Sequence, residues 1–203
     1  AVGSLKEDLS PGTFILVDQF IDRTTNREKS FFDDGIVAHV PMASPISKEL
    51  MKSSEIIFKK LKLIYSIGGI YLAMEGPQFS TYAESNLYRQ WGCDVIGMTN
   101  MPEVKLAREA EIRYCSIAMV TDYDCWHPDH DNVDINILIK TLHDNVDKSK
   151  LFINEFSKYY YQGIDFKNND TSSILDVSIV TKKDSWDKNL ESKLSNILKR
   201  YKN

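Results

Sequence analysis

The chain has 203 residues, of which 42% are hydrophobic and 27% charged, and this length and balance predict a globular protein with one sizeable core. A net charge of −4 argues against a nucleic-acid-binding protein, because there is no basic excess to neutralise phosphates. The three cysteines lack CxxC spacing, which favours reduced thiols in a cytoplasmic protein, and no apolar run approaches the length of a membrane span.

The first half of the chain alternates between short runs rich in β-branched residues and one amphipathic helical pattern. Strands are predicted at residues 13–20, 35–42 and 70–75, and a helix at residues 47–64. Each strand is bounded by glycine or proline, the usual turn residues. This part of the chain therefore indicates strands connected by a helix.

Two further helices are expected to begin at capping sequences. Thr81 and Glu84 form a T-x-x-E capping box, which predicts a helix over residues 82–91. Asn100 and Glu103 predict the start of another helix that ends near residue 110.

The remaining pattern continues the alternation. Strands are predicted at 94–98, 114–121 and 174–180, and helices at 132–156 and 185–201. Alternating strands and helices imply βαβ units. We therefore predict an α/β fold with a mixed, largely parallel central sheet flanked by helices, in one domain that spans residues 1–203.

Polar residues follow three of the predicted strands. They are Glu75 to Ser80, Met98 to Asn100 and Thr121 to Asp124. Ligands of such sheets bind at the carboxyl ends of strands. We therefore expect these three segments to converge on one site.

The carboxylates of Asp122 and Asp124 leave three interpretations open: a catalytic acid or base, a metal site, or capping of a loop. Nearby polar residues match no metal-ligand template, because their spacing is irregular, and we predict no metal site; they are His127, Asp129, His130 and Asp131.

Two other segments also have a structural and a functional interpretation. Phe79 could be a core aromatic residue or a flat surface on which a base stacks. Thr99 could belong to a simple turn, or its hydroxyl could bind phosphate beside a helix N-terminus.

Taken together and in this order, the motifs resemble those of the trimeric purine nucleoside phosphorylase superfamily, and within it the 5′-methylthioadenosine phosphorylases. The segments that carry the resemblance are DQFIDRTT (18–25), AHVPM (38–42), EGPQFSTYAES (75–85), DVIGMTNMPEVKLAREA (94–110) and SIAMVTDYDCWH (116–127).

The resemblance implies a role for each matching residue. Asp122 would act on purine N7 and is the implied catalytic residue. The others would bind parts of the substrates: Phe79, Ser80 and Asp124 the purine, Met98 the ribose, Ala1 and Thr99 the phosphate, and Ile135, Leu138, Ile139 and the His39 of a neighbouring subunit the methylthio group.

The implied activity is phosphorolysis of 5′-methylthioadenosine to adenine and 5-methylthioribose 1-phosphate, a pentosyltransferase reaction of purine and methionine salvage. The resemblance also implies a cytoplasmic homotrimer that needs inorganic phosphate as co-substrate and no cofactor. Two alternatives stay open: a 6-oxopurine nucleoside phosphorylase, and a catalytically impaired nucleoside-binding fragment or subunit.

The sequence departs from the family pattern at its start. Family members carry a further segment before AVGSL, which supplies the first strands of the sheet and much of the phosphate site. We therefore expect an incomplete domain with little activity on its own, whose missing segment could lie on a separate chain. The stretch between Arg23 and His39 is also shorter than is usual in the family.

Overall fold

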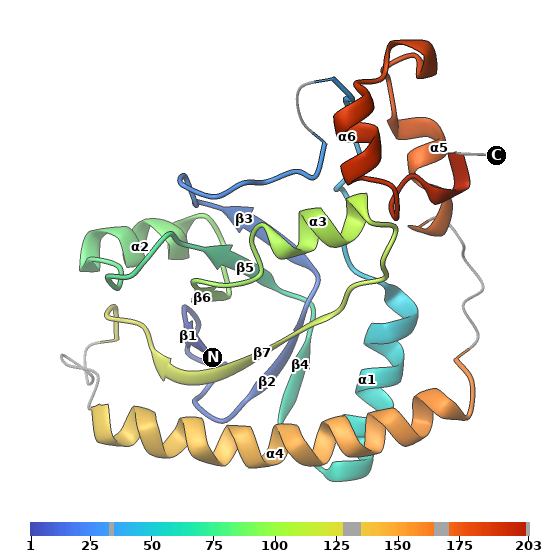
Figure 1. Cartoon of the computed structure of the whole chain (residues 1–203). Helices are drawn as coiled ribbons and strands as arrows, with labels where there is room; N and C mark the ends of the chain where they lie inside the picture. The colour runs from blue at the N-terminus through green and yellow to red at the C-terminus, as the bar shows by residue number, and fades with distance from the viewer. Residues whose placement is uncertain (33–34, 128–134, 165–170, 202–203) are drawn as a thin grey trace.

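The computed structural model describes residues 1–32, 35–127, 135–164 and 171–201. In this part of the chain one seven-stranded sheet forms the centre of the molecule, in the order β3-β5-β6-β1-β7-β2-β4 (Figure 1). The strands are β1 (Val2–Ser4), β2 (Phe14–Val17), β3 (Gln19–Asp22), β4 (Tyr65–Ile67), β5 (Ile70–Ala73), β6 (Val95–Gly97) and β7 (Ser116–Tyr123).

The sheet is mixed and largely parallel, as the sequence predicts. Four neighbouring pairs are parallel, namely β1 with β7, β2 with β4, β3 with β5 and β5 with β6. Two pairs, β1 with β6 and β2 with β7, are antiparallel. Helices flank this sheet, and the α/β prediction is confirmed; they are α1 (Lys48–Leu61), α2 (Tyr82–Gln90), α3 (Glu103–Glu109), α4 (Ile135–Tyr161), α5 (Leu175–Ser178) and α6 (Lys188–Lys193).

Local capping signals decide where two of the helices begin. The Ser47 hydroxyl accepts a hydrogen bond from the Leu50 amide at the start of α1. Thr81 and Glu84 form the predicted reciprocal capping box at the start of α2. Each satisfies backbone amides that have no partner within the helix.

The predicted cap of α3 is wrong. The helix begins at Glu103 after Pro102, and no side chain caps it. The Asn100 side chain instead accepts hydrogen bonds from Tyr114 Oη (2.8 Å) and Ser116 Oγ (3.2 Å). A tertiary contact with the start of β7 thus replaces the local one.

The predicted strand at 13–20 divides at Asp18 into β2 and β3. The two parts pair with different neighbours, β2 with β7 and β4, and β3 with β5. The Asp18 amide donates to the Gly69 carbonyl (3.2 Å) where the chain passes from one part to the other. Propensity alone cannot show such a change of partner. The short strands β1 and β4 were not predicted either.

The predictions for the C-terminal region are also wrong in part. Residues 174–180 contain the short helix α5 rather than a strand, and the predicted helix at 185–201 is broken into 3₁₀ turns around α6. The predicted strand at 35–42 is only an isolated bridge between Ala38 and Ile179.

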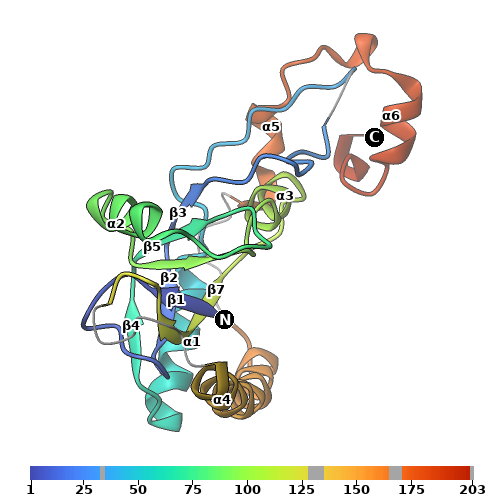
Figure 2. The same ribbon diagram turned by 90° about the vertical axis from the view of Figure 1, so that its left-hand side faces the viewer.

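The apolar residues of these segments pack against one another in a separate cluster, formed by Phe32, Ile36, Ile174, Leu175, Trp186, Leu194 and Leu198. Figure 2 shows α5 and α6 beside the chain that follows β3, beyond the edge of the sheet.

The helices α1 and α4 cover one region of the sheet through an aromatic cluster. Phe58 of α1 is fully buried, with ring centroids 5.8 Å from Phe14, 5.5 Å from Tyr65 and 5.0 Å from Phe152. These rings come from β2, β4 and α4. Among the helices that the structure describes, none is both long and apolar enough to cross a bilayer.

We predict that Phe58→Ala lowers the free energy of unfolding by about 3–5 kcal/mol, because it leaves a cavity where four elements meet. Ile64→Ala, at a side chain that is 69% exposed, serves as the control and should change it by less than about 0.5 kcal/mol. Urea denaturation measures both. Equal small losses would contradict the central position of Phe58.

Candidate active site

A cavity of about 340 Å³ lies where the three predicted polar segments meet. Its volume is within the range of small-molecule sites. The residues that line it come from Ala1 and β1, from the segment after β5, from β6 and the segment after it, and from the end of β7 and the residue that follows: Ala1, Val2, Gly3, Met74, Phe79, Ile96, Gly97, Met98, Thr99, Thr121, Asp122 and Asp124. The expected convergence is therefore confirmed.

The reason for the convergence differs from the predicted one. Because β1 is antiparallel to β6 and parallel to β7, β7 runs opposite to β6, and the segments do not share one carboxyl edge. Gly3 of β1 lies opposite both Ile96 and Asp122. The short strand β1 therefore lies between Asp122 on β7 and the cavity residues of β6.

Asp122 lies near the end of β7, Asp124 directly follows that strand, and both side chains come close to Gly3 of β1. Both lie over Gly3. A Cβ atom added to Gly3 would come within 3.2 Å of Asp122 Oδ1 and 3.3 Å of Asp124 Cβ. The absence of a side chain at Gly3 thus makes room for two carboxylates side by side.

Burial is the main influence on Asp122 and raises the pKa of its carboxyl group. The negative charge of Asp124 raises that pKa further, whereas a 2.6 Å hydrogen bond from Thr121 Oγ1 opposes the shift. The pKa is raised on balance. The surroundings of Asp122 therefore favour the protonated form of its carboxyl group.

Asp124 is buried and held by Ser80. The Ser80 hydroxyl lies 2.8 Å from Asp124 Oδ2 and 3.1 Å from Oδ1, and both residues are at least nine-tenths buried. Ser80 lies just before the capping box of α2, so this contact joins the α2 loop to the end of β7. The contact orients the carboxylate of Asp124 within the cavity wall.

The Thr99 hydroxyl is placed by Tyr71 of β5. Tyr71 Oη lies 3.1 Å from Thr99 Oγ1 and accepts a hydrogen bond from the Thr99 amide (3.3 Å). A Cβ atom at Gly97 would lie 2.1 Å from Tyr71 Oη, so glycine is required there. Burial raises the pKa of Tyr71 and keeps its hydroxyl protonated at neutral pH.

The apolar part of the cavity includes Phe79, whose side chain is 78% exposed. Phe79 is therefore not a core aromatic residue, and its ring is open to a ligand. Met98 also lines the cavity and lies against Gly76, where an added Cβ atom would be 2.6 Å from the Met98 sulfur. Ala1 also lines the cavity.

Other predicted site residues lie elsewhere in this chain. His39 is exposed and borders a different cavity, near Phe32 and Ile36. Ile139 is 44% exposed on α4, and the side chains of Ile135 and Leu138 lie outside the described residues. The expectation that His39 serves a neighbouring subunit stays a prediction.

Within the described parts of the chain, no three His, Cys, Asp or Glu side chains gather as a potential metal site. Three residues considered as metal ligands, Asp129, His130 and Asp131, lie outside those parts. His127 is buried and its Nε2 lies 3.2 Å from Glu7 Oε1, which gives it a structural contact.

Gly3, Tyr71 and Gly97 were not predicted as site residues from the sequence. A glycine within a predicted strand is a signal of close backbone or side-chain approach, and Gly97 in the segment DVIGM carried that signal. Tyr71 and Gly3 gave no local signal, because only pairing of β1, β5 and β6 brings them to the site.

The family model of the phosphorylase superfamily matches residues 1–157. The chain belongs to the phosphorylase superfamily. Among the relatives of this phosphorylase-superfamily chain, S-methyl-5′-thioadenosine phosphorylase of Rhodospirillum rubrum is 63% identical over 153 residues, which are 75% of this chain and 52% of that protein. The enzyme of the same name from Bradyrhizobium diazoefficiens is 49% identical over 194 residues, 96% of this chain and 67% of that protein.

Solved structures of this phosphorylase superfamily agree with the fold. A methylthioadenosine phosphorylase from an antarctic soil metagenomic library has a TM-score of 0.86 at 38% identity, over 97% of this chain and 69% of that one. Methylthioadenosine phosphorylase from Schistosoma mansoni in complex with adenine has a TM-score of 0.81 at 28% identity, over 88% and 70%. The chain thus spans about half to two thirds of the relatives that it matches.

The raised pKa of Asp122 predicts a pH-dependent effect of Asp122→Asn on stability. A raised folded-state pKa stabilises the native state below the unfolded value of about 4, and this contribution is lost as pH rises through the folded pKa. We expect wild type and Asp122→Asn to melt at similar temperatures at pH 4, and the variant to become relatively more stable toward pH 8.

Thermal melts followed by circular dichroism measure this difference. Asp147→Asn is the control, because the Asp147 side chain is 76% exposed on α4 and should show little change with pH. A gap between wild type and Asp122→Asn that is constant with pH would contradict the assignment.

Proposed function

We propose that the protein to which this chain belongs is a 5′-methylthioadenosine phosphorylase, which converts its substrate and phosphate into adenine and 5-methylthioribose 1-phosphate. The observation that carries this proposal is the pair of carboxylates in the cavity, one of them with a raised pKa. The names of the relatives support it.

Asp122 is the proposed catalytic residue. Cleavage of the glycosidic bond develops negative charge on the purine as it leaves. A protonated Asp122 donates a hydrogen bond or a proton to purine N7 and stabilises that charge. The burial that raises its pKa therefore also makes it a suitable acid.

Asp124 is the proposed acceptor for the 6-amino group. The Ser80 hydroxyl lies within hydrogen-bond distance of both oxygens of its carboxylate, and the remaining lone pairs can accept from an amino group. A 6-oxopurine would place an oxygen against this acceptor and lose affinity. This favours an aminopurine over the 6-oxopurine alternative, in whose family branch the position of Asp122 is usually Asn. Phe79 then stacks on the base.

Met98 would contact the ribose, and the hydroxyl of Thr99, with the backbone at Ala1, would contribute to phosphate binding. Tyr71 supports this role of Thr99, because it fixes both the amide and the hydroxyl. Among the described residues that line the cavity there is no Lys, Arg or His side chain. We infer that cationic groups other than the described residues of this cavity complete the phosphate site.

The methylthio group would be bound by Ile135, Leu138 and Ile139 together with the His39 of a neighbouring subunit, in a homotrimer. The position of His39 supports this assignment, since it is exposed and does not line the cavity of its own chain. Burial of a methyl group contributes only about 1 kcal/mol, so adenosine should be a slower substrate.

We predict that Asp122→Ala lowers kcat for 5′-methylthioadenosine by about 100-fold or more, because the acid at N7 is removed. The assay follows phosphate-dependent release of adenine by a form of the protein long enough to span its relatives. Asp147→Ala is the control and should retain wild-type turnover. Undiminished turnover by Asp122→Ala would contradict the mechanism, and faster cleavage of inosine than of 5′-methylthioadenosine would support a 6-oxopurine phosphorylase.

The lack of basic side chains around the described cavity also favours a second candidate, a nucleoside-binding chain without activity of its own. We expect the 203-residue chain to bind adenine in calorimetry and to show little phosphate-dependent turnover by itself. Brisk turnover by a sample whose intact mass shows only this chain would contradict the proposed incompleteness of the phosphate site.

A further inference from the structure

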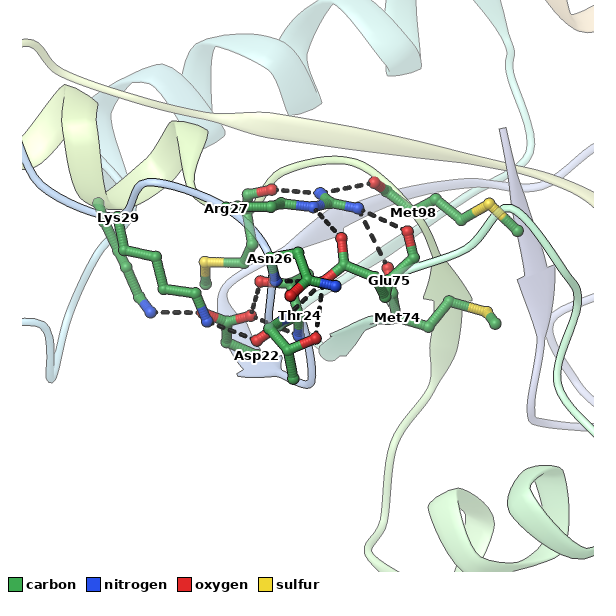
Figure 3. Close-up of polar contacts among 11 residues, drawn as sticks. Asp22, Thr24, Asn26, Arg27, Lys29, Met74, Glu75 and Met98 are labelled. Carbon is green, nitrogen blue, oxygen red and sulfur yellow. Dashed lines mark hydrogen bonds and ion pairs between the residues drawn. The ribbon is translucent and has the colours of Figure 1, made fainter.

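Arg27, in the loop after β3, uses all five N–H donors of its guanidinium group (Figure 3). Nε donates to Glu75 Oε1 (3.0 Å), and Nη1 donates to the carbonyls of Met98 (2.9 Å) and Met101 (2.5 Å). Nη2 donates to the carbonyls of Glu75 (2.9 Å) and Met74 (3.4 Å). Arg27 does not line the cavity. Its contacts are almost all with backbone, which indicates a role in holding chain segments together.

The acceptors of Arg27 belong to two loops that form different walls of the cavity. Met74 and Glu75 begin the loop after β5, which continues to Phe79 and Ser80. Met98 begins the loop after β6, and Thr99 follows it directly. The planar guanidinium of Arg27 therefore bridges the loop that continues to Phe79 and the loop that carries Met98.

The two loops that Arg27 bridges lie close together. Gly76 has a φ of +72°, and a side chain there would collide with the sulfur of Met98. The two loops are thus in contact at Gly76, where there is no room for a side chain. A change in the contacts of Arg27 would move Met98 relative to the loop that carries Phe79.

Glu75 fixes the other end of this arrangement. Its Oε2 accepts from the backbone amides of Thr25 and Asn26, the latter at 3.0 Å, while Oε1 accepts from Arg27. The two amides and the guanidinium lower the pKa of Glu75 to about 2, so the carboxylate is charged throughout the neutral range.

Asp22, the last residue of β3, holds the start of the loop that contains Arg27. Burial favours the neutral acid, but hydrogen bonds from Lys105, Thr24 and Lys29 hold the pKa of Asp22 well below its usual range. Lys29 lies 3.0 Å from Asp22 Oδ2, and the Thr24 amide lies 2.9 Å from Oδ1. The chain is thus held on both sides of Arg27, at Asp22 and Thr24 before it and at Lys29 after it.

We propose that Arg27 is a positioning residue, which holds the loops after β5 and β6 at the separation that purine and ribose binding require. The inference rests on the proposed function, because it assigns the two loops to the two halves of a nucleoside. Lysine cannot replace Arg27, since three donors on a tetrahedral nitrogen cannot bridge four carbonyls and a carboxylate.

Calorimetric titration with adenine tests the proposal on Arg27→Ala and Arg27→Lys, well below their melting temperatures. We expect the Kd for adenine to rise roughly tenfold in both variants, because the loop that carries Phe79 and Ser80 shifts. Methylguanidinium added to Arg27→Ala should restore part of the affinity, whereas methylammonium at the same concentration should not. Arg200→Ala is the matched control, because Arg200 also pairs with carboxylates, of Glu111 and Asp176, but far from the cavity. Its Kd should stay within about twofold of wild type.

If Arg27 served stability alone, Arg27→Ala would melt at a lower temperature, but its Kd for adenine would be unchanged. Methylguanidinium would then give no selective rescue. An unchanged Kd, or equal rescue by both cations, would overturn the proposal.

If Arg27→Ala does not fold, Glu75→Gln replaces it. The glutamine side chain must turn its NH₂ group toward either Arg27 or the amides of Thr25 and Asn26, because it has only one oxygen to accept their hydrogen bonds. Its Kd should also rise, and an unchanged value would overturn the proposal. Failure of wild type to bind adenine would overturn the proposed function and this inference with it, whereas binding by wild type and Arg27→Ala alike would overturn the inference alone.

Discussion

Two carboxylates lie side by side over a strand residue that has no side chain, and the candidate site depends on this arrangement. Asp122 near the end of β7 and Asp124 just after it both lie against Gly3 of β1, which leaves the space that they occupy. Burial and the negative charge of Asp124 disfavour a second negative charge on Asp122, and they raise the pKa of its carboxyl group. A carboxyl group that costs stability when ionised is also one that is able to donate a proton.

The remainder of the cavity is shaped by residues that do not line it. Tyr71 hydrogen-bonds with the amide and the hydroxyl of Thr99, and Arg27 joins the loops after β5 and β6. Both act through hydrogen bonds to backbone groups and to one side chain each, of Thr99 and Glu75. The site is therefore set by a layer of polar contacts between the sheet and the loops.

Membership of the phosphorylase superfamily rests on residues 1–157, and the C-terminal residues lie beyond the family match. They form a cluster of their own with Phe32 and Ile36, next to the loop that presents His39. The sheet and its cavity thus belong to the shared part of the fold. The C-terminal cluster packs against the segment that the proposed trimer would use for a neighbouring site.

The sequence by itself determined the features that depend on local patterns. The α/β alternation, the start of α1, the capping box of α2 and the strands β5 and β6 follow from spacing and capping chemistry, which act over a few residues. The grouping of Phe79, Met98, Thr99, Asp122 and Asp124 was also predicted, from polar residues at strand ends and from motif resemblance. Their individual roles stay proposals.

Only the tertiary structure decided the features that depend on distant partners. The division of residues 13–20 into β2 and β3 follows from different neighbours in the sheet, and the C-terminal helix and strand predictions were wrong because their apolar residues pack as a separate cluster. The pKa of Asp122 and the five contacts of Arg27 have the same origin. Burial and hydrogen bonding between segments far apart in the chain leave no local pattern in the sequence, and they exist only once the sheet has brought those segments together.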